Sequence, residues 1–209
     1  MSLYNHQLTF RPLLGGVEIY VPRVNEVGTL GFLARDGADG DQRWLVSCYH
    51  VLVGGPGSAP VLAEGVLQPA AAPLPAAFVD ALRCDPVLDC AAAKIAGGVG
   101  VTCEILGVGP IGVPADALVG MRVIKSGAAT GITEGVILEI QGDDVIIGIP
   151  EGFDPNYDLS RAGDSGALWL SREDFSPVAL HISEMGGPQK RVKARRILSI
   201  LAALRFRVA

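Results

Sequence analysis

Ser165 stands between glycines in the tetrapeptide Gly163-Asp164-Ser165-Gly166. Flanking glycines let the backbone make a tight turn and leave the serine hydroxyl exposed. Such a turn directs successive N–H groups at one point, as stabilisation of an oxyanion requires. The sequence therefore predicts a serine nucleophile at this turn, and the alternative is an ordinary turn with no chemistry.

A serine nucleophile needs a base, and histidine is the usual one. The chain has 3 histidines. His50 lies within Leu45–Leu52 and is expected to close an apolar strand, where a buried structural histidine is the alternative to a base. His6 lies near the N-terminus, where order is least assured. His181 lies inside an apolar strand-like run and is expected in the core or in a pocket wall, which leaves His50 as the candidate base.

A carboxylate must hold the imidazole in the correct tautomer. Asp80, Asp85 and Asp89 lie between the candidate base and the nucleophile. Asp85 precedes a proline and is typical of a turn, and Asp80 is expected on a solvent-facing side of a strand. Asp89 opens an apolar run, where an unpaired carboxylate costs several kcal/mol. Asp89 is therefore the predicted partner of His50.

Composition favours an all-β protein. Hydrophobic residues make up 49% of the 209 residues, and 27 glycines and 14 prolines divide the chain into short pieces. The formal net charge is -5, and no basic stripe is present, so nucleic acid is an unexpected partner. The one basic run, 190–196, is interpreted as a solvated helix end.

About ten to twelve short strands, separated by turn residues, indicate sandwiches or barrels. The stretch 107–120, rich in Gly and Pro, is interpreted as a link, which gives an N-terminal domain 1–108 and a C-terminal domain 109–209. Apolar residues at helical spacing predict one amphipathic helix over Val192–Leu204. The expected strands are Gly28–Arg35, Arg43–Leu52, Phe78–Arg83, Asp89–Ile95, Val101–Leu106, Arg122–Gly127, Glu134–Ile140, Asp144–Ile149, Ser165–Leu170 and Val178–Ser183.

The N-terminal residues have no charged region followed by a long apolar one, and no apolar run is long enough for a membrane span. The sequence therefore predicts a cytoplasmic protein with no membrane partner. The four cysteines match no metal-binding spacing and are expected as free thiols. Cys84 with Cys103 is the disulfide to examine if that expectation is wrong.

The order His50, Asp89, Ser165 is that of chymotrypsin. Five segments in that order resemble the trypsin-like serine peptidases of bacteria, in particular intracellular forms. The resemblance covers about Arg11 to Val208. The segments are RPLLGGVEI with GTLGFLARDG and LVSCYHVL, then DCAAAKI, VIKSGAATGITEGVI, AGDSGALWL and PVALHIS, followed by the closing helix.

The resemblance implies two packed six-stranded antiparallel β-barrels and a C-terminal helix, with the site in the cleft between the barrels. It implies an endopeptidase in which Ser165 attacks the scissile carbonyl, His50 transfers the proton and Asp89 orients His50. The N–H groups of Gly163 and Ser165 are expected to hold the oxyanion. Protein or peptide is the expected substrate, and no metal or cofactor is expected.

The specificity pocket is expected from Leu159 and the strand that carries Ile182, Ser183 and Glu184. Leu159 stands six residues before the nucleophile and predicts an apolar P1 side chain, the residue before the scissile bond. Glu184 stands where the family that the sequence resembles usually has a small residue at the pocket rim. It is expected to narrow the pocket or to favour a basic group of the substrate, unless the loop is shifted. Asp164 needs a partner that the sequence does not name. Alanines in KSGAATG, where the family often has Arg-Thr, suggest a lost contact.

Two alternatives to the endopeptidase stay open. A binding module with this fold has a site that is silent or activated by a partner, and the altered rim at Glu184 favours it. An esterase, or an enzyme that cleaves only itself, uses the same triad. The sequence identifies no regulatory partner, although an intracellular protease is expected to be controlled.

Overall fold

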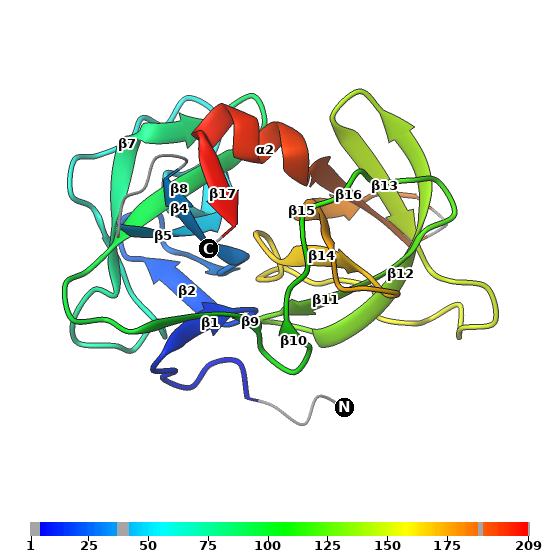
Figure 1. The fold of residues 1–209 in the computed structure, drawn as a ribbon, viewed down its shortest axis with the longest axis horizontal. Coiled ribbons are helices and arrows are strands. Elements are labelled where there is room, and N and C mark those ends of the chain that lie inside the picture. The colour runs from blue at the N-terminus through cyan, green and yellow to red at the C-terminus, as the bar shows by residue number, and fades with distance from the viewer. Residues whose placement is uncertain (1–4, 37–41, 188–189, 209) are drawn as a thin grey trace.

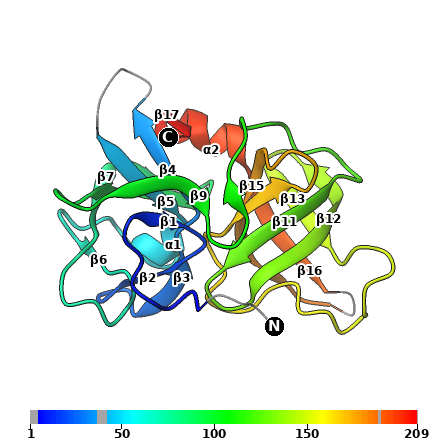
Figure 2. The same ribbon diagram turned by 60° about the horizontal axis from the view of Figure 1, so that its bottom comes forward.

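The computed structural model describes residues 5–36, 42–187 and 190–208. Figure 1 shows strands gathered in two lobes, with helix α2 (Ile197–Leu204) across the top between them. Figure 2, turned by 60°, keeps this helix between the same two groups of strands. Helix α2 packs against strands of both lobes, so it ties them together.

The C-terminal lobe is a closed barrel with strand order β11-β12-β13-β16-β15-β14. All of its pairings are antiparallel. Strand β12 alternates between buried and more exposed residues, as a strand with one face in a core must. The strands are β11 (Arg122–Gly127), β12 (Gly131–Gln141), β13 (Asp144–Gly148), β14 (Leu168–Ser171), β15 (Pro177–Met185) and β16 (Arg191–Arg196).

The N-terminal lobe has an open six-stranded sheet with order β17-β4-β5-β8-β7-β6. Strands β2 and β3 form a separate pair, and β1-β9-β10 form a third sheet, in which β1 and β9 are parallel. The strands are β1 (Leu13–Gly15), β2 (Glu18–Val21), β3 (Glu26–Thr29), β4 (Phe32–Asp36), β5 (Arg43–Ser47), β6 (Gly65–Val66), β7 (Ala77–Asp85), β8 (Cys90–Ile95), β9 (Val101–Ile105), β10 (Gly109–Pro110) and β17 (Phe206–Val208).

The all-β prediction is confirmed, and the closed barrel of the C-terminal lobe fits it. The expected closure of the N-terminal half is wrong, because its main sheet ends on two strands that do not pair with each other. Strand β6 is only 2 residues long and β17 only 3, so neither edge offers a ladder long enough to close the sheet.

The single helix expected over Val192–Leu204 is also wrong. Residues 191–196 form strand β16, in which Val192 and Ala194 are buried and their neighbours are half-buried. Strand β16 pairs with β13 on one side and β15 on the other. The two-residue period of a strand therefore governs this stretch, and the helix begins only at Ile197.

The chain after the helix returns to the N-terminal lobe. Strand β17 pairs with β4 antiparallel, with Phe206 opposite Asp36 and Val208 opposite Ala34. The Phe206 ring lies 5.6 Å from the ring of Trp44. The last strand of the described chain thus completes the sheet that carries the first half of the site.

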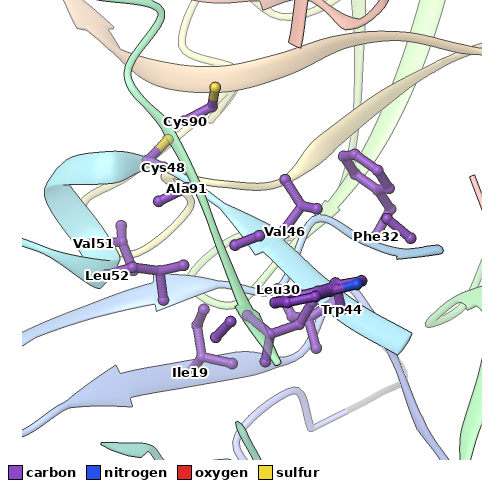
Figure 3. Packing of buried hydrophobic residues seen from close by; sticks show 14 of the residues in the cluster. Ile19, Leu30, Phe32, Trp44, Val46, Cys48, Val51, Leu52, Cys90 and Ala91 are labelled. Carbon is purple, nitrogen blue, oxygen red and sulfur yellow. The ribbon is translucent and has the colours of Figure 1, made fainter. Parts of the chain in front are cut away.

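The core of the N-terminal lobe lies between its sheets, as Figure 3 shows for part of it. Ile19 from β2, Val46 from β5 and Leu52 from helix α1 (Tyr49–Leu52) are fully buried there. Burial of each such side chain contributes about 1.5–3 kcal/mol to the free energy of unfolding. This packing fixes the ends of β5 and β8, from which the candidate site residues extend.

No helix in the described ranges is long and apolar enough to cross a membrane.

Candidate active site

The expected base and its carboxylate are joined in the structure. His50 Nδ1 lies 2.7 Å from Asp89 Oδ2, and the His50 backbone N–H donates to Asp89 Oδ1 at 3.0 Å. A carboxylate only accepts hydrogen bonds, so the proton of the neutral imidazole lies on Nδ1. Nε2 is therefore free to accept a proton.

His50 lies in the short helix α1, directly after β5, and not at the end of a long strand as the sequence suggested. The Tyr49 N–H donates to the Asp89 carbonyl at 3.1 Å, which ties the start of α1 to the residue before β8. Asp89 itself has a positive φ of 53°. This left-handed conformation, which Asp tolerates better than most residues, turns its side chain back to His50.

Ser165 lies in the turn before β14, as its flanking glycines predict. Gly163 and Gly166 have φ values of +104° and +92°. The Ser165 hydroxyl donates to the Ile182 carbonyl at 2.9 Å. In the part of the chain that the structure describes, no hydrogen bond joins Ser165 Oγ to His50, so the hydroxyl must turn away from Ile182 to meet the imidazole.

One cleft of about 870 Å³ brings all three residues to a common surface. Its walls come from both lobes, which places His50 and Asp89 opposite Ser165. Ile182 and Ser183 also line it, as do Lys193 and Arg195, which both pair with Asp144.

The N–H groups of Gly163 and Ser165 have no acceptor within the described ranges. Other backbone groups hold this turn: the Thr29 N–H donates to the Ser165 carbonyl at 2.8 Å, and the Gly166 N–H donates to the His181 carbonyl at 2.9 Å. The two free N–H groups are thus available to a bound oxyanion.

Asp164 has the partner that the sequence did not name. Lys125 Nζ lies 2.9 Å from Asp164 Oδ2, and both side chains are fully buried. Thr130 Oγ1 donates to the same oxygen at 2.6 Å. The backbone N–H groups of Ala129 and Thr130 donate to Oδ1 at 3.0 and 3.1 Å. The KSGAATG segment therefore binds Asp164 through a lysine, a threonine and two amides.

This set of contacts decides the charge of Asp164. Burial alone raises the pKa of the carboxyl, but the charge of Lys125 and the hydrogen bonds from Lys125 and Thr130 outweigh it and lower the pKa to about 2. Burial lowers the pKa of Lys125, and the charge of Asp164 opposes that change. The residue before Ser165 is thus held as a carboxylate.

Thr29 connects the N-terminal lobe to the nucleophile turn. Its hydroxyl donates to the Gly163 carbonyl at 2.8 Å and accepts from the Ala128 N–H at 2.9 Å. Its carbonyl accepts from the Ser47 hydroxyl at 2.8 Å. One side chain from β3 therefore positions the turn that carries Ser165.

The residues expected to form the specificity pocket separate in the structure. Leu159 is only 1% exposed and packs in the core of the barrel. Glu184 is exposed and borders a second cavity of about 340 Å³, together with the segment 158–161. Ile182 and Ser183 belong to the main cleft instead. Leu159 itself belongs to the segment that borders this second cavity, so its expected role in the choice of the P1 side chain stays a prediction.

His181 is buried as expected, and its contacts are specific. Nε2 lies 2.9 Å from Ser160 Oγ, and the Trp169 indole N–H donates to Nδ1 at 3.3 Å. Burial, followed by the nearby charge of Lys125, lowers the pKa of His181 to about 3. His181 is therefore neutral at physiological pH.

The structure has all four cysteines as free thiols, including Cys84 and Cys103. The donor atoms of Cys48, His50 and Asp89 lie within 4.8 Å of one another, as in a metal-binding group. These atoms already have partners, because Nδ1 bonds to Oδ2 and the Cys48 thiol donates to the His181 carbonyl at 3.1 Å.

Sequence reasoning did not find Lys125, Thr29 or Ser160. The Lys125 signal was present, since a lysine that directly follows the apolar residues Val123 and Ile124 in a short strand is expected to be buried only if it is paired. Thr29 and Ser160 had no such signal. Their roles depend on contacts between segments that lie far apart in the sequence.

No family model matches the sequence, and no curated protein matches it. Solved structures do match in fold. Thermobifida fusca protease A has a TM-score of 0.70 at 18% identity, covering 94% of this chain and 97% of that one. Nocardiopsis protease has a TM-score of 0.69 at 15% identity, covering 93% and 97%.

A third match is a serine protease described as specific for glutamic acid, with a histidine triad in substrate binding. Its TM-score is 0.71 at 17% identity, and the alignment covers 94% of this chain and 100% of that one. Identities this low establish the fold and not the activity. The chain has the chymotrypsin-like fold of serine proteases.

Proposed function

We propose that this chain is a serine endopeptidase that hydrolyses peptide bonds through an acyl-enzyme intermediate. The observation that carries the proposal is the meeting of Ser165 with the hydrogen-bonded pair His50 and Asp89 in one cleft. If His50 were only structural and the Ser165 turn were an ordinary turn, nothing would require residues from two lobes to line the same cleft. The fold of known serine proteases supports the same conclusion.

In the proposed reaction the Ser165 hydroxyl leaves the Ile182 carbonyl and attacks the scissile carbonyl carbon. His50 Nε2 takes the hydroxyl proton, and the N–H groups of Gly163 and Ser165 bind the oxyanion. His50 then gives that proton to the leaving amine as the C–N bond breaks. Water, deprotonated by His50, cleaves the resulting ester and restores Ser165.

Asp89 stabilises the imidazolium that forms in each step and keeps the Nδ1 proton in place. The Lys125–Asp164 pair holds the turn from inside the barrel, so the chain's own lysine fixes the residue next to the nucleophile. No step in this scheme calls for a metal or cofactor. The expected substrate is a protein or peptide.

One observation favours the alternative of a silent or partner-activated binding module. In the structure the Ser165 hydroxyl bonds to the Ile182 carbonyl and not to the imidazole. A partner or substrate that displaces this bond would switch the site on. The cytoplasmic location and a regulatory partner stay predictions.

Labelling with a fluorophosphonate probe tests the proposal. Labelling of the wild type, with none in Ser165→Ala and at least ~10³-fold slower labelling in His50→Ala, supports an activated nucleophile. Cleavage of a denatured protein by the wild type alone then distinguishes a peptidase from an esterase. A folded wild type that does not react would contradict the proposal and favour the binding module.

A further inference from the structure

A second groove lies outside the candidate active site, where helix α2 and strand β17 meet the segment that joins the two lobes. Its volume is about 540 Å³, and its walls come from residues 111–114, from α2, from β17 and from Arg35 in β4. Figure 1 shows β17 beside α2. Among the described residues, none lines both this groove and the cleft that holds Ser165. The groove is therefore a surface separate from the cleft.

The walls of the groove are largely apolar. Leu198 and Leu201 line it from α2, and Val113 lines it from the joining segment. Leu198 is 38% exposed and Val113 is 81% exposed, whereas Ile197 and Ile200 already attach α2 to the core. Clustered apolar side chains that the core does not use are typical of an interaction surface.

The two charged residues in the described walls of the groove are both arginines. Arg35 in β4 and Arg207 in β17 are exposed and stand directly opposite each other in the strand pairing. Within residues 5–36, 42–187 and 190–208, neither side chain has a hydrogen bond, an ion pair or a ring contact. The nearby carboxylate of Asp36 pairs with Arg83 instead. Like charges in directly opposite positions destabilise a sheet, so this pair lacks an anion between its members.

The geometry of the pair suits one carboxylate. Directly opposite residues of an antiparallel pair point to the same face, with Cβ atoms about 4.5–5.5 Å apart. The planar guanidinium groups of Arg35 and Arg207 can therefore both reach one anion, and arginine binds carboxylates through paired N–H groups. The apolar walls favour a carboxylate that is carried by an apolar segment over a free, hydrated anion.

The position of β17 favours an extended segment. Strand β17 is the end strand of its sheet in the described chain, so β4 pairs with one side of it and no strand pairs with the other. All three of its residues border the groove, although neighbouring side chains of a strand point to opposite faces. The groove therefore runs along the free edge of β17, where an extended segment can add by main-chain hydrogen bonds.

We propose that this groove docks an extended segment of a partner protein in which one glutamate or aspartate stands between apolar residues. The carboxylate binds Arg35 and Arg207 together, and the apolar neighbours lie against Leu198 and Val113. The edge of β17 bonds to the main chain of the segment. Docking leaves the cleft around Ser165 open, and it does not depend on whether Ser165 is a nucleophile.

Fluorescence anisotropy with the full chain carrying Ser165→Ala tests the proposal without cleavage of the probe. The probes are rhodamine-labelled peptides of sequence Ser-Val-Leu-Glu-Leu-Val-Ser, and the same peptide with Gln or Lys in place of Glu. The Glu peptide is expected to bind at least ~10-fold more tightly than the Gln peptide, and the Lys peptide least tightly. Added salt should reduce the advantage of Glu. Equal binding of the Glu and Gln peptides overturns the proposal.

Arginine variants locate the anion site. Arg207→Gln and Arg35→Gln are each expected to remove most of the Glu-to-Gln preference. Arg205→Gln, at an exposed arginine outside the groove, is expected to keep it. Arg207→Gln removes one of two like charges, so its melting temperature should not fall, which separates lost docking from lost folding. If the preference survives both groove variants, the arginine pair is not the anion site and the proposal fails.

A leucine variant tests the apolar wall. Leu198→Ser is expected to weaken the Glu and Gln peptides by the same factor, at least ~5-fold, because both peptides bury apolar residues there. Leu82→Ser, at a leucine that is 92% exposed in β7, is the matched control and should change neither. Unchanged binding in Leu198→Ser would show that the peptides bind elsewhere, and would overturn the proposal.

Self-association is the competing explanation of the groove. Sedimentation equilibrium of the Ser165→Ala chain without peptide is expected to give a monomer. A dimer that Arg207→Gln dissociates would assign the groove to a second copy of the chain and overturn the proposed partner.

Discussion

Lys125 and Asp164 form an ion pair in the interior of the barrel, 2.9 Å apart and closed to solvent. Removing two charges from water costs several kcal/mol each, and only good geometry with further hydrogen bonds offsets it. Thr130 and two backbone amides supply those bonds to Asp164. The turn that carries Ser165 is therefore held from the barrel interior by a buried network in which each charged group needs its hydrogen-bond partners.

Replacement of the lysine, Lys125→Met, is expected to lower the free energy of unfolding by about 3–5 kcal/mol, because Asp164 keeps a buried charge with no cation beside it. Urea denaturation measures the loss. Arg122→Met, on the exposed end of the same strand, serves as the control and should cost less than ~1 kcal/mol. Equal losses in the two variants would show that the buried pair contributes no more to the free energy of unfolding than an exposed one.

The ion pair also predicts how stability depends on pH. The pKa of Asp164 is about 2 in the folded chain, against an ordinary value of 3.8. As pH falls, the unfolded chain binds this proton first, so the stabilisation is complete above about pH 4 and is lost as pH falls through 2. The loss is about 2 kcal/mol for this group.

Unfolding free energies measured between about pH 6 and pH 2 test that expectation. The wild type should lose more stability on acidification than Asp164→Asn, which has no carboxyl to protonate at that position. Asp154→Asn, in an exposed turn, should follow the wild type. An identical slope in Asp164→Asn and the wild type would rule out this carboxyl as the source.

Asp89→Asn tests the orientation of the base. Asn tolerates the positive φ found at this position, so the fold should survive. The amide N–H₂ can donate to Nδ1, which then stabilises the wrong tautomer of His50. The rate of fluorophosphonate labelling is expected to fall by ~10³–10⁴-fold with little change in the melting temperature. Labelling at the wild-type rate would exclude Asp89 from the triad.

Thr29→Val tests the link between the lobes. Valine keeps the shape of threonine but removes the donor to the Gly163 carbonyl and the acceptor for the Ala128 N–H. A loss of about 1–3 kcal/mol is expected, since a buried N–H is left without a partner. Labelling should slow as well, because the Ser165 turn loses a support. Thr29→Ser restores the hydroxyl and should recover most of both.

Gly166→Ala tests the close approach behind the nucleophile. A Cβ at this position would lie 2.1 Å from Ser47 Oγ and 2.4 Å from the Thr29 carbonyl, and the φ of +92° is strained for alanine. The expected loss is about 3 kcal/mol or more. Gly97→Ala, with no atom within 4 Å of a Cβ, should change the melting temperature little. Comparable melting temperatures for the two variants would show that position 166 does not require glycine.

The three candidate residues could be selected from the sequence because each carries a local signal. Glycines mark Ser165, an unpaired carboxylate before an apolar strand marks Asp89, and few histidines compete with His50. The structure joins His50 to Asp89 and brings Ser165 into the same cleft, while the roles of the three residues stay predictions until labelling is measured.

What the sequence did not predict depends on contacts between distant segments. The sequence predicts a helix over strand β16 because Val192, Ile197 and Ile200 fit a helical period by coincidence. Pairing with β13 and β15 determines its conformation instead. The open sheet of the N-terminal lobe results from short edge strands, whose pairing no local pattern reveals. Lys125 and Ser160 acquire their partners only when the barrel closes.

The pairing of β17 with β4 has a consequence for the order in which the molecule is made. During synthesis from the N-terminus, β4 emerges early. Its outer edge has no pairing strand until residues 206–208 have been made, which is later than Ser165. An exposed edge readily pairs with other chains. A nascent chain, or one truncated before these residues, is therefore expected to need shielding by a chaperone, and the two halves of the site become a stable unit only after residues 206–208 have been made.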